Sequence, residues 1–230
     1  MDILKVSNLS KSFDGKKIID GVTFSVKSGK IVGLLGKNGS GKTTIIKMIN
    51  DLLTIDDGEI LVSGENISEK TKAVVSYLPE RTYLDASKTV GECIDFFEEF
   101  YDDFDREKAN ALLKDLGLES GVSLSKMSKG MKEKIQLILV MSRKAKLYIL
   151  DEPFGGVDPS TRDYIMKTII KNFGEDSAML ITTHLVSDVE KILDEVIFID
   201  NGKIILSGDA ETLREDRGIS IDGIFRSIVK

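Results

Sequence analysis

The chain has 230 residues, of which 41% are hydrophobic and 30% are charged, which suits one globular domain with a subdomain inserted in it. A formal net charge of −6 argues against nucleic acid as the main partner, because such binding depends on neutralising phosphates with basic side chains. A single cysteine, Cys93, fits a reducing compartment, and the longest nearly apolar run, Ile135–Met141, is interrupted by Gln136 and too short to cross a bilayer, so we expect a cytosolic protein.

Short β-rich runs separated by glycines open the chain. They lie at Leu4–Leu9 and Val22–Val26, and a further run, Glu59–Val62, follows the turn-forming pair Asp57-Gly58. Near the other end, two strand-like runs are joined by Asn201-Gly202, which is a strong signal for a β-hairpin.

Three runs are apolar enough to be fully buried parallel strands. They are Ile31–Leu35, Leu147–Leu150 and Ala178–Thr182. Amphipathic helical stretches lie between them. This alternation predicts an α/β layered domain.

The segment from about Arg81 to Leu124 has no strand signals and predicts helices over Val90–Phe104 and Arg106–Leu116, the second ended by Gly117. We expect it to be a helical subdomain inserted in the α/β body. Helical spacing predicts one aromatic stripe on the first helix, opposite an acidic face. The stripe either packs the subdomain or partly lines a groove; its residues are Phe96, Phe97, Phe100, Tyr101 and Phe104.

A phosphate-binding loop is indicated at Gly36–Thr43, where the sequence GKNGSGKT matches the pattern G-x-x-x-x-G-K-[ST] in full. A strand-like run precedes it and a helix-forming run follows it, so backbone N–H groups and a helix N-terminus can face phosphate oxygens. We expect Lys42 to reach the β- and γ-phosphates and the Thr43 hydroxyl to bind Mg²⁺. The residues expected to contact the nucleotide are Asn38, Gly39, Ser40, Gly41, Lys42, Thr43 and Thr44.

Polar side chains also follow the other two buried runs. Asp151 and Glu152 end the run Leu147–Leu150, where uncompensated charge is costly and where a doubly wound sheet opens on its nucleotide. We expect Asp151 to hold the water shell of Mg²⁺ and Glu152 to polarise the attacking water; alternatively, both acids cap the next turn. His184, the only histidine, follows the third run and is either structural or a sensor of the γ-phosphate.

With these motifs in this order, nearly the whole chain resembles the nucleotide-binding domains of ABC ATPases. Phe13 lies where the family has an aromatic residue that stacks on adenine, and Glu80, in the run VSYLPE, lies at the Q-loop position. Asp158, in GGVD, matches the D-loop, and His184 fits the switch histidine. Glu80 departs from the family's glutamine, although its carboxylate can still bind Mg²⁺ through oxygen.

The run MSKGM, residues 127–131, resembles the family's signature motif, LSGGQ, with Lys129 for the first glycine and Met131 for the glutamine. Ser128 can cap the following helix, and Gly130 permits close approach of a γ-phosphate to the helix start. In the family this motif acts on the ATP held by a second subunit, so that two subunits enclose two ATPs. The alternative is a plain helix cap.

The resemblance implies an α/β P-loop NTPase fold of the ABC-ATPase type. It has a mostly parallel core sheet, an N-terminal antiparallel β subdomain and an inserted helical subdomain. Residues 1–230 would form one such domain, with the helical subdomain at about residues 81–145.

YLPE and SKGMK further resemble ATPases paired with ABC-2-type membrane subunits, which mostly export drugs, peptides or lipids. The resemblance implies an ATPase that uses ATP and Mg²⁺ and couples hydrolysis to transport. Its expected partners are integral-membrane transporter subunits and a second ABC ATPase subunit, in a homodimer or heterodimer. Its expected location is the cytoplasmic face of the cell membrane, where part of the aromatic stripe could line a groove for the membrane partner. Nucleic acid is not an expected partner.

Two other classes remain open. One is a soluble ABC ATPase that serves DNA repair, ribosome function or iron–sulfur assembly; a soluble partner would favour it. The other is a P-loop kinase or GTPase, but the chain has no N-K-x-D guanine motif, and neither class accounts for the SKGMK helix.

Overall fold

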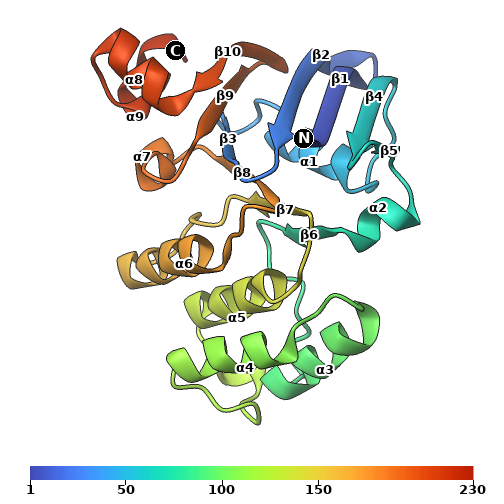
Figure 1. Ribbon diagram of the computed structural model, residues 1–230, viewed down its shortest axis with the longest axis vertical. Coiled ribbons are helices and arrows are strands. Elements are labelled where there is room, and N and C mark those ends of the chain that lie inside the picture. The colour runs from blue at the N-terminus through green and yellow to red at the C-terminus, as the bar shows by residue number, and fades with distance from the viewer. Residues whose placement is uncertain (230) are drawn as a thin grey trace.

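The computed structural model describes residues 1–229, so Lys230, the last residue of the expected domain, lies outside the described residues. Its strands form two sheets (Figure 1). The first is antiparallel and has the order β2-β1-β4-β5. Its strands are β1 (Asp2–Phe13), β2 (Lys16–Lys27), β4 (Asp57–Val62) and β5 (Glu65–Asn66).

The second sheet has six strands in the order β10-β9-β3-β8-β7-β6, and all neighbours are parallel except β10 and β9. These strands are β3 (Ile31–Leu35), β6 (Val75–Leu78), β7 (Leu147–Asp151), β8 (Ala178–Thr183), β9 (Glu195–Asp200) and β10 (Lys203–Asp209). The expected α/β fold with a mostly parallel core sheet and an N-terminal antiparallel β subdomain is confirmed.

The helices lie on the sheets and below them in Figure 1. They are α1 (Lys42–Ile49), α2 (Glu69–Ala73), α3 (Val90–Phe100), α4 (Arg106–Asp115), the 3₁₀ helix η1 (Leu124–Lys126), α5 (Lys129–Met141), α6 (Pro159–Asn172), α7 (Val186–Val189), α8 (Ala210–Arg217) and α9 (Ile221–Ile228). Among the described residues, no helix has the length and apolar character needed to span a membrane.

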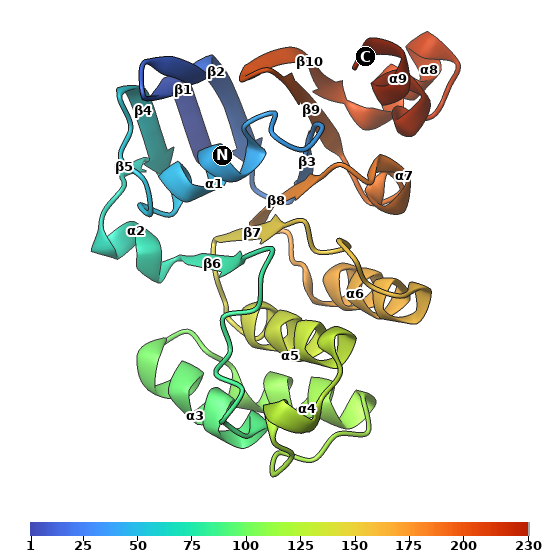
Figure 2. The ribbon, with the colours of Figure 1, turned by 180° about the vertical axis from the view of Figure 1, so that it is seen from behind.

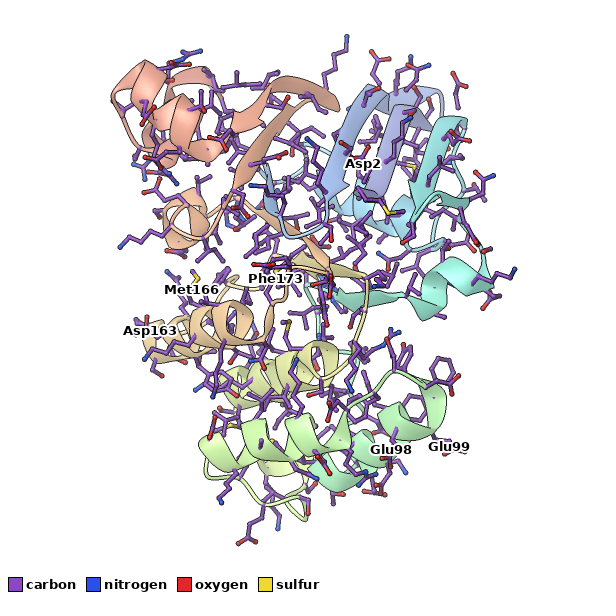
Figure 3. All side chains as sticks on the ribbon, in the orientation of Figure 1. Asp2, Glu98, Glu99, Asp163, Met166 and Phe173 are labelled. Carbon is purple, nitrogen blue, oxygen red and sulfur yellow. The ribbon has the colours of Figure 1, made fainter. Side chains whose placement is uncertain are left out.

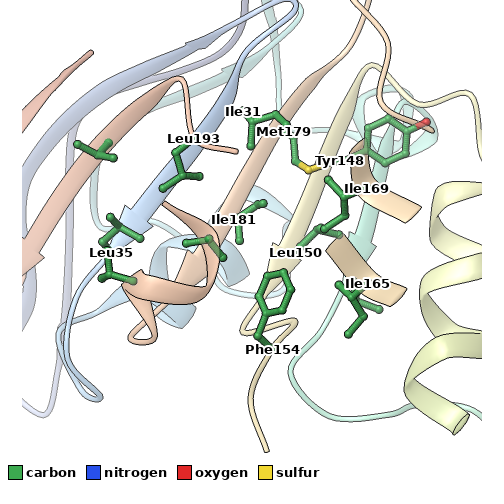
Figure 4. Close-up of a cluster of buried hydrophobic side chains, with 14 of the residues drawn as sticks. Ile31, Leu35, Tyr148, Leu150, Phe154, Ile165, Ile169, Met179, Ile181 and Leu193 are labelled. Atoms are coloured by element: carbon green, nitrogen blue, oxygen red, sulfur yellow. The ribbon is translucent and has the colours of Figure 1, made fainter. Parts of the chain in front are cut away.

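Hydrophobic side chains cover both faces of the parallel sheet. Every residue of β3, β7 and β8 is buried, which explains why these strands read as unbroken apolar runs. On one face, Leu150 and Ile181 belong to the same core cluster as Ile165 and Ile169 of α6 (Figure 4). The opposite face packs against the antiparallel sheet and α1. The polar residues that follow these strands are therefore held on a rigid support.

Helices α3, α4 and α5 form a layer with its own core at the far end of the molecule (Figure 2). They fall within the expected subdomain. The expected helix Val90–Phe104 is too long, because α3 ends at Phe100 and Tyr101 has extended backbone dihedral angles. Asp105 then caps α4 by accepting a hydrogen bond from the Lys108 N–H, so a turn replaces the last part of the expected helix.

The five aromatic residues of the expected stripe do not share one buried face. Phe97 is buried, and Tyr101 and Phe104 pack around it. Phe96 and Phe100 are 58% and 66% exposed and stack on each other, with their ring centroids 5.7 Å apart. The set is therefore divided into a core group around Phe97 and an exposed pair, because Phe96 and Phe100 lie one turn apart on a neighbouring side of the helix.

Arg143 joins the helical layer to the parallel sheet. Its side chain is 2% exposed and forms an ion pair with Asp103 at 2.8 Å. It also donates to the carbonyl oxygens of Val75, at 2.6 Å, and Ala73, while its guanidinium lies 3.8 Å from the centroid of the Tyr101 ring. One buried cation therefore satisfies acceptors on both sides of the junction.

Replacing Arg143 with methionine should lower the free energy of unfolding by about 2–4 kcal/mol, because two buried carbonyl groups and Asp103 lose their donor. Urea unfolding followed by circular dichroism measures this change. The control is Lys144→Met, which removes a neighbouring ion pair with Asp105 whose lysine is 73% exposed and which should cost less than about 1 kcal/mol. Equal losses in the two variants would contradict the assigned role of Arg143.

Candidate functional site

Three strands of the parallel sheet end side by side. Leu35 of β3 is paired with Thr183 of β8, and Asp151 of β7 is paired with Thr182. Because the strands are parallel, the segments that follow them emerge at one edge of the sheet. This edge therefore brings together the glycine-rich loop, the acidic pair and the histidine.

The glycine-rich loop connects β3 to α1. Gly41, at the N-cap of α1, has φ of +108°, and a Cβ atom there would collide with the side chain of Ile19. Only glycine fits both constraints. The Ser40 side chain is buried, and its hydroxyl has no hydrogen-bond partner among the described residues. The loop thus has the tight curvature and the spare polar capacity that a phosphate cradle needs.

Lys42 and Glu152 form a buried ion pair. The Lys42 ammonium lies 3.2 Å from Glu152 Oε1, and their side chains are 5% and 7% exposed. Lys42 also donates to the carbonyl oxygens of Gly36, at 2.7 Å, and Lys37, at 3.2 Å. The ammonium is therefore held over the loop by one carboxylate and two carbonyl dipoles.

Glu152 also contacts His184. Its Oε2 atom lies 2.9 Å from His184 Nδ1 and accepts a hydrogen bond from the His184 backbone N–H at 3.3 Å. Glu152 has φ of +49°, in the left-handed region, which is unfavourable for glutamate. Its backbone N–H donates to the Thr182 carbonyl at 3.0 Å, which helps to hold this conformation. Such strain is concentrated at functional sites.

Asp151 is 1% exposed, and its Oδ1 atom accepts hydrogen bonds from the hydroxyls of Thr182 and, at 3.5 Å, Thr43. Burial raises the pKa of Asp151; the two hydroxyls lower it, while the carboxylates of Glu152 and Glu80 raise it. Burial also raises the pKa of Tyr77, and the charges of Asp151 and Glu80 add to this effect. Glu80 therefore lies within electrostatic reach of Asp151.

A cavity of about 1130 Å³ opens over these groups. Phe13, 44% exposed, lies at its wall, with Lys11 Nζ 5.6 Å from its ring centroid. The cavity is large enough for a nucleotide. Of the site residues expected from the sequence, the lining residues are Phe13, Asn38, Gly39, Gly41, Lys42, Thr43, Thr44, Glu80, Glu152 and His184.

Ser128, Gly130 and Asp158 do not line this cavity. Ser128 caps α5, accepting a hydrogen bond from the Met131 N–H at 3.3 Å. Asp158 caps α6, and the Ser160 and Thr161 hydroxyls and the Thr161 N–H lower its pKa. A Cβ atom on Gly130 would lie 3.0 Å from Thr161 Oγ1, so this glycine lets α5 approach α6. Within one chain these residues have structural roles.

Several residues of the site were not expected from the sequence. Thr182 bonds the Asp151 carboxylate but lies inside an apolar run, so only its position two residues before His184 hinted at a role. Lys129, which replaces the first glycine of the signature pattern, also lines the cavity. The further lining residues that were not expected are Ile18, Arg81, Thr82, Lys132, Glu133, Gly155 and Gly156.

A family model described as ABC transporter matches residues 19–155, which contain the glycine-rich loop and the acidic pair. The chain belongs to the ABC transporter ATPase family. The ATP-binding protein YtrB of Bacillus subtilis (strain 168) is 30% identical over 217 residues, covering 93% of this chain and 74% of that protein. The lipopolysaccharide export system ATP-binding protein LptB of Haemophilus influenzae (strain ATCC 51907 / DSM 11121 / KW20 / Rd) is 32% identical, covering 95% of each chain.

Further relatives carry the name Nod factor export ATP-binding protein I; that of Sinorhizobium fredii (strain NBRC 101917 / NGR234) is 29% identical over 93% of this chain and 65% of its own. Among solved structures, an ATP-binding subunit of an ABC transporter is 26% identical, with a TM-score of 0.90 over 99% of this chain and 100% of that chain. Fold, site and relatives together identify an ABC ATPase that hydrolyses ATP.

Replacing Asp151 with asparagine should raise the free energy of unfolding at pH 7, since a buried carboxyl with a raised pKa destabilises the fold while it is ionised. Asparagine keeps the oxygen that accepts from the two threonines. The gain should shrink as the pH falls through the pKa of the folded state and be lost below about pH 4, where the carboxyl is protonated in both states. Urea unfolding between pH 4 and pH 8 measures whether the substitution raises or lowers the free energy of unfolding. A variant that is less stable than the unchanged protein at pH 7 would contradict it.

Proposed function

We propose that this chain is the ATP-hydrolysing subunit of an exporter-type ABC transporter, in which two such subunits close around two Mg-ATP. The observation that carries the proposal is the contact chain from Lys42 through Glu152 to His184, inside a cavity walled by Phe13. Export is supported by relatives whose names refer to export of lipopolysaccharide and Nod factor.

In this proposal the adenine ring stacks on Phe13 and the phosphates lie in the loop from Asn38 to Thr44. When phosphate oxygens enter, the Lys42 ammonium exchanges its two carbonyl acceptors for them. This exchange also weakens the ion pair between Lys42 and Glu152. The same step that binds the nucleotide thereby frees the carboxylate for chemistry.

The residues expected to hold Mg²⁺ are Thr43, Asp151 and Glu80. No group of three or more histidine, cysteine or acidic residues is placed to hold a metal ion anywhere in the described part of the chain. The set still fits Mg²⁺, which in phosphate sites keeps several waters and takes one or two protein ligands beside the phosphates. Bound there, Mg²⁺ would neutralise charge on the phosphates.

Glu152 is the general base in this proposal, and His184 is the residue that contacts the γ-phosphate. A freed Glu152 carboxylate accepts a hydrogen bond from the attacking water and polarises it. His184 stays in place because its backbone N–H and ring nitrogen both lie against Glu152. The chemistry therefore depends mainly on positioning, as is typical of phosphoryl transfer.

The second subunit supplies Ser128, Gly130 and Asp158 in this proposal. Ser128 is exposed at the N-terminus of α5, and Lys129 beside it is 72% exposed. A helix N-terminus of this kind suits the γ-phosphate of the ATP on the facing chain. The partner ATPase is either a second copy or a related subunit, and nucleic acid has no part in the cycle.

The membrane partner is proposed to bind a second cavity, of about 940 Å³, between α3 and the body of the domain. Phe96, Phe100, Tyr83 and Leu52 line it and are exposed, so it offers an apolar surface for a helix of the membrane subunits. Acidic residues of α3 itself, among them Glu98 and Glu99, are exposed to solvent (Figure 3). Docking here would hold the chain at the cytoplasmic face of the membrane.

Replacing Glu152 with glutamine should lower ATP turnover by about 10²–10⁴-fold, because the amide cannot accept the proton of the attacking water. With hydrolysis blocked, the closed dimer should accumulate in the presence of Mg-ATP. Phosphate release and size-exclusion chromatography measure the two effects. Glu211→Gln, at a 71% exposed carboxylate on α8, is the control and should change neither. Ordinary turnover in the Glu152 variant would remove Glu152 as the base.

Replacing both Phe96 and Phe100 with serine should prevent membrane subunits from co-purifying in mild detergent, because the docking cavity loses its stacked aromatic pair. The ATPase activity of the isolated chain should stay unchanged. Ile170→Ser, at a 57% exposed residue of α6, controls for the loss of exposed apolar surface. Full co-purification by the double variant would disprove docking at this cavity, and a soluble partner would favour a non-transport ABC ATPase.

A further inference from the structure

Gln136 is a polar residue in the most apolar part of α5. It lies between Ile135 and Leu137, both fully buried, and is itself 3% exposed. Burying an amide without full hydrogen bonding is costly, so its place in this helix calls for a partner. The geometry of its two amide atoms shows what that partner is.

The amide nitrogen of Gln136 donates a long hydrogen bond, 3.4 Å, to the carbonyl oxygen of Pro79. Only the nitrogen can face that carbonyl, because the amide oxygen would be repelled by it. Pro79 directly precedes Glu80, where the chain leaves β6 and crosses to the helical layer. This bond therefore joins the signature helix to the first residues of the Q-loop.

The amide oxygen of Gln136 and the Oε2 atom of Glu133 are both buried and have no hydrogen-bond partner among the described residues. The two residues lie three positions apart, on the same face of α5. Both line a small cavity of about 20 Å³, together with Pro79, Glu80 and Glu152. A space of this size holds one water molecule, and one water can donate to two acceptors.

The cavity lies at the meeting point of three segments that contact the nucleotide in the proposed cycle. Glu80 belongs to the Q-loop, Glu152 follows β7, and Glu133 stands four residues after Lys129 on α5. A polar contact here links movements of the helical layer to the position of Glu80. An apolar residue at position 136 would fill the space but break that link.

We propose that Gln136 is a positioning residue that ties the signature helix α5 to the Q-loop, through the Pro79 carbonyl and one water bound against Glu133. The role rests on the proposed ATPase cycle. The effect of Gln136 on the nucleotide is indirect, because Gln136 does not line the nucleotide cavity.

The test compares the full chain with Gln136→Leu. Because an apolar side chain of similar volume relieves the buried amide oxygen, thermal stability should be unchanged or higher. The kcat for ATP should fall about fivefold, the factor that corresponds to one net hydrogen bond, while KM changes by less than about twofold. Amide hydrogen exchange at residues 80–84 should become faster. Gln136→Met is the second variant and should behave alike.

Ile138→Val, a buried change on the same helix, is the control and should leave kcat and the exchange of residues 80–84 unchanged. Unchanged exchange and kcat in both Gln136 variants would overturn the proposal, as would a drop in thermal stability that accounts for the lost activity. Hydrogen exchange needs no turnover. A failure of the ATPase assignment, seen as no hydrolysis by the unchanged chain, is therefore distinguishable from a failure of the Gln136 role.

Discussion

The ion pair between Lys42 and Glu152 is the interaction on which the site depends. It joins two residues 110 positions apart in the sequence, and it exists because β3 and β7 run in the same direction on either side of β8. Each charge would be unfavourable in this buried place without the other. A bound phosphate would weaken this ion pair, because the Lys42 ammonium would then interact with a second anion. In the proposed cycle, the fold therefore holds the general base, Glu152, against the ammonium group that binds the phosphates.

Buried polar side chains join the helical layer to the body of the domain. Arg143 satisfies Asp103 on the layer and two carbonyl groups beside β6, while Gln136 donates to the carbonyl of Pro79, just before Glu80. Helices α3 and α4 pack on the core of the layer itself. Helix α5 is shared with the body of the domain, because Leu137, Val140 and Met141 belong to the core on one face of the parallel sheet. The proposed docking of a membrane partner on the exposed aromatic pair of α3 would act on this layer.

Much of the fold and site could be predicted because their signals are local. The glycine-rich loop, the Asp151-Glu152 pair and the Asn201-Gly202 hairpin each occupy a few consecutive residues with a fixed backbone requirement. The prediction of a helix through Phe104 was wrong, because the spacing of apolar residues does not show that Asp105 caps the next helix. Contacts such as Thr182 with Asp151 depend on strand order, which no pattern in the sequence specifies.

The single histidine allows a direct test of the site. His184 gives one imidazole C2–H resonance in the proton spectrum of the full chain, and its Nδ1 lies against Glu152, which in turn pairs with Lys42. Titration with a slowly hydrolysed ATP analogue and Mg²⁺ should shift this resonance saturably, and Lys42→Ala should weaken the effect strongly. A resonance that stays in place at saturating nucleotide would contradict the assignment of Lys42, Glu152 and His184 to the nucleotide site.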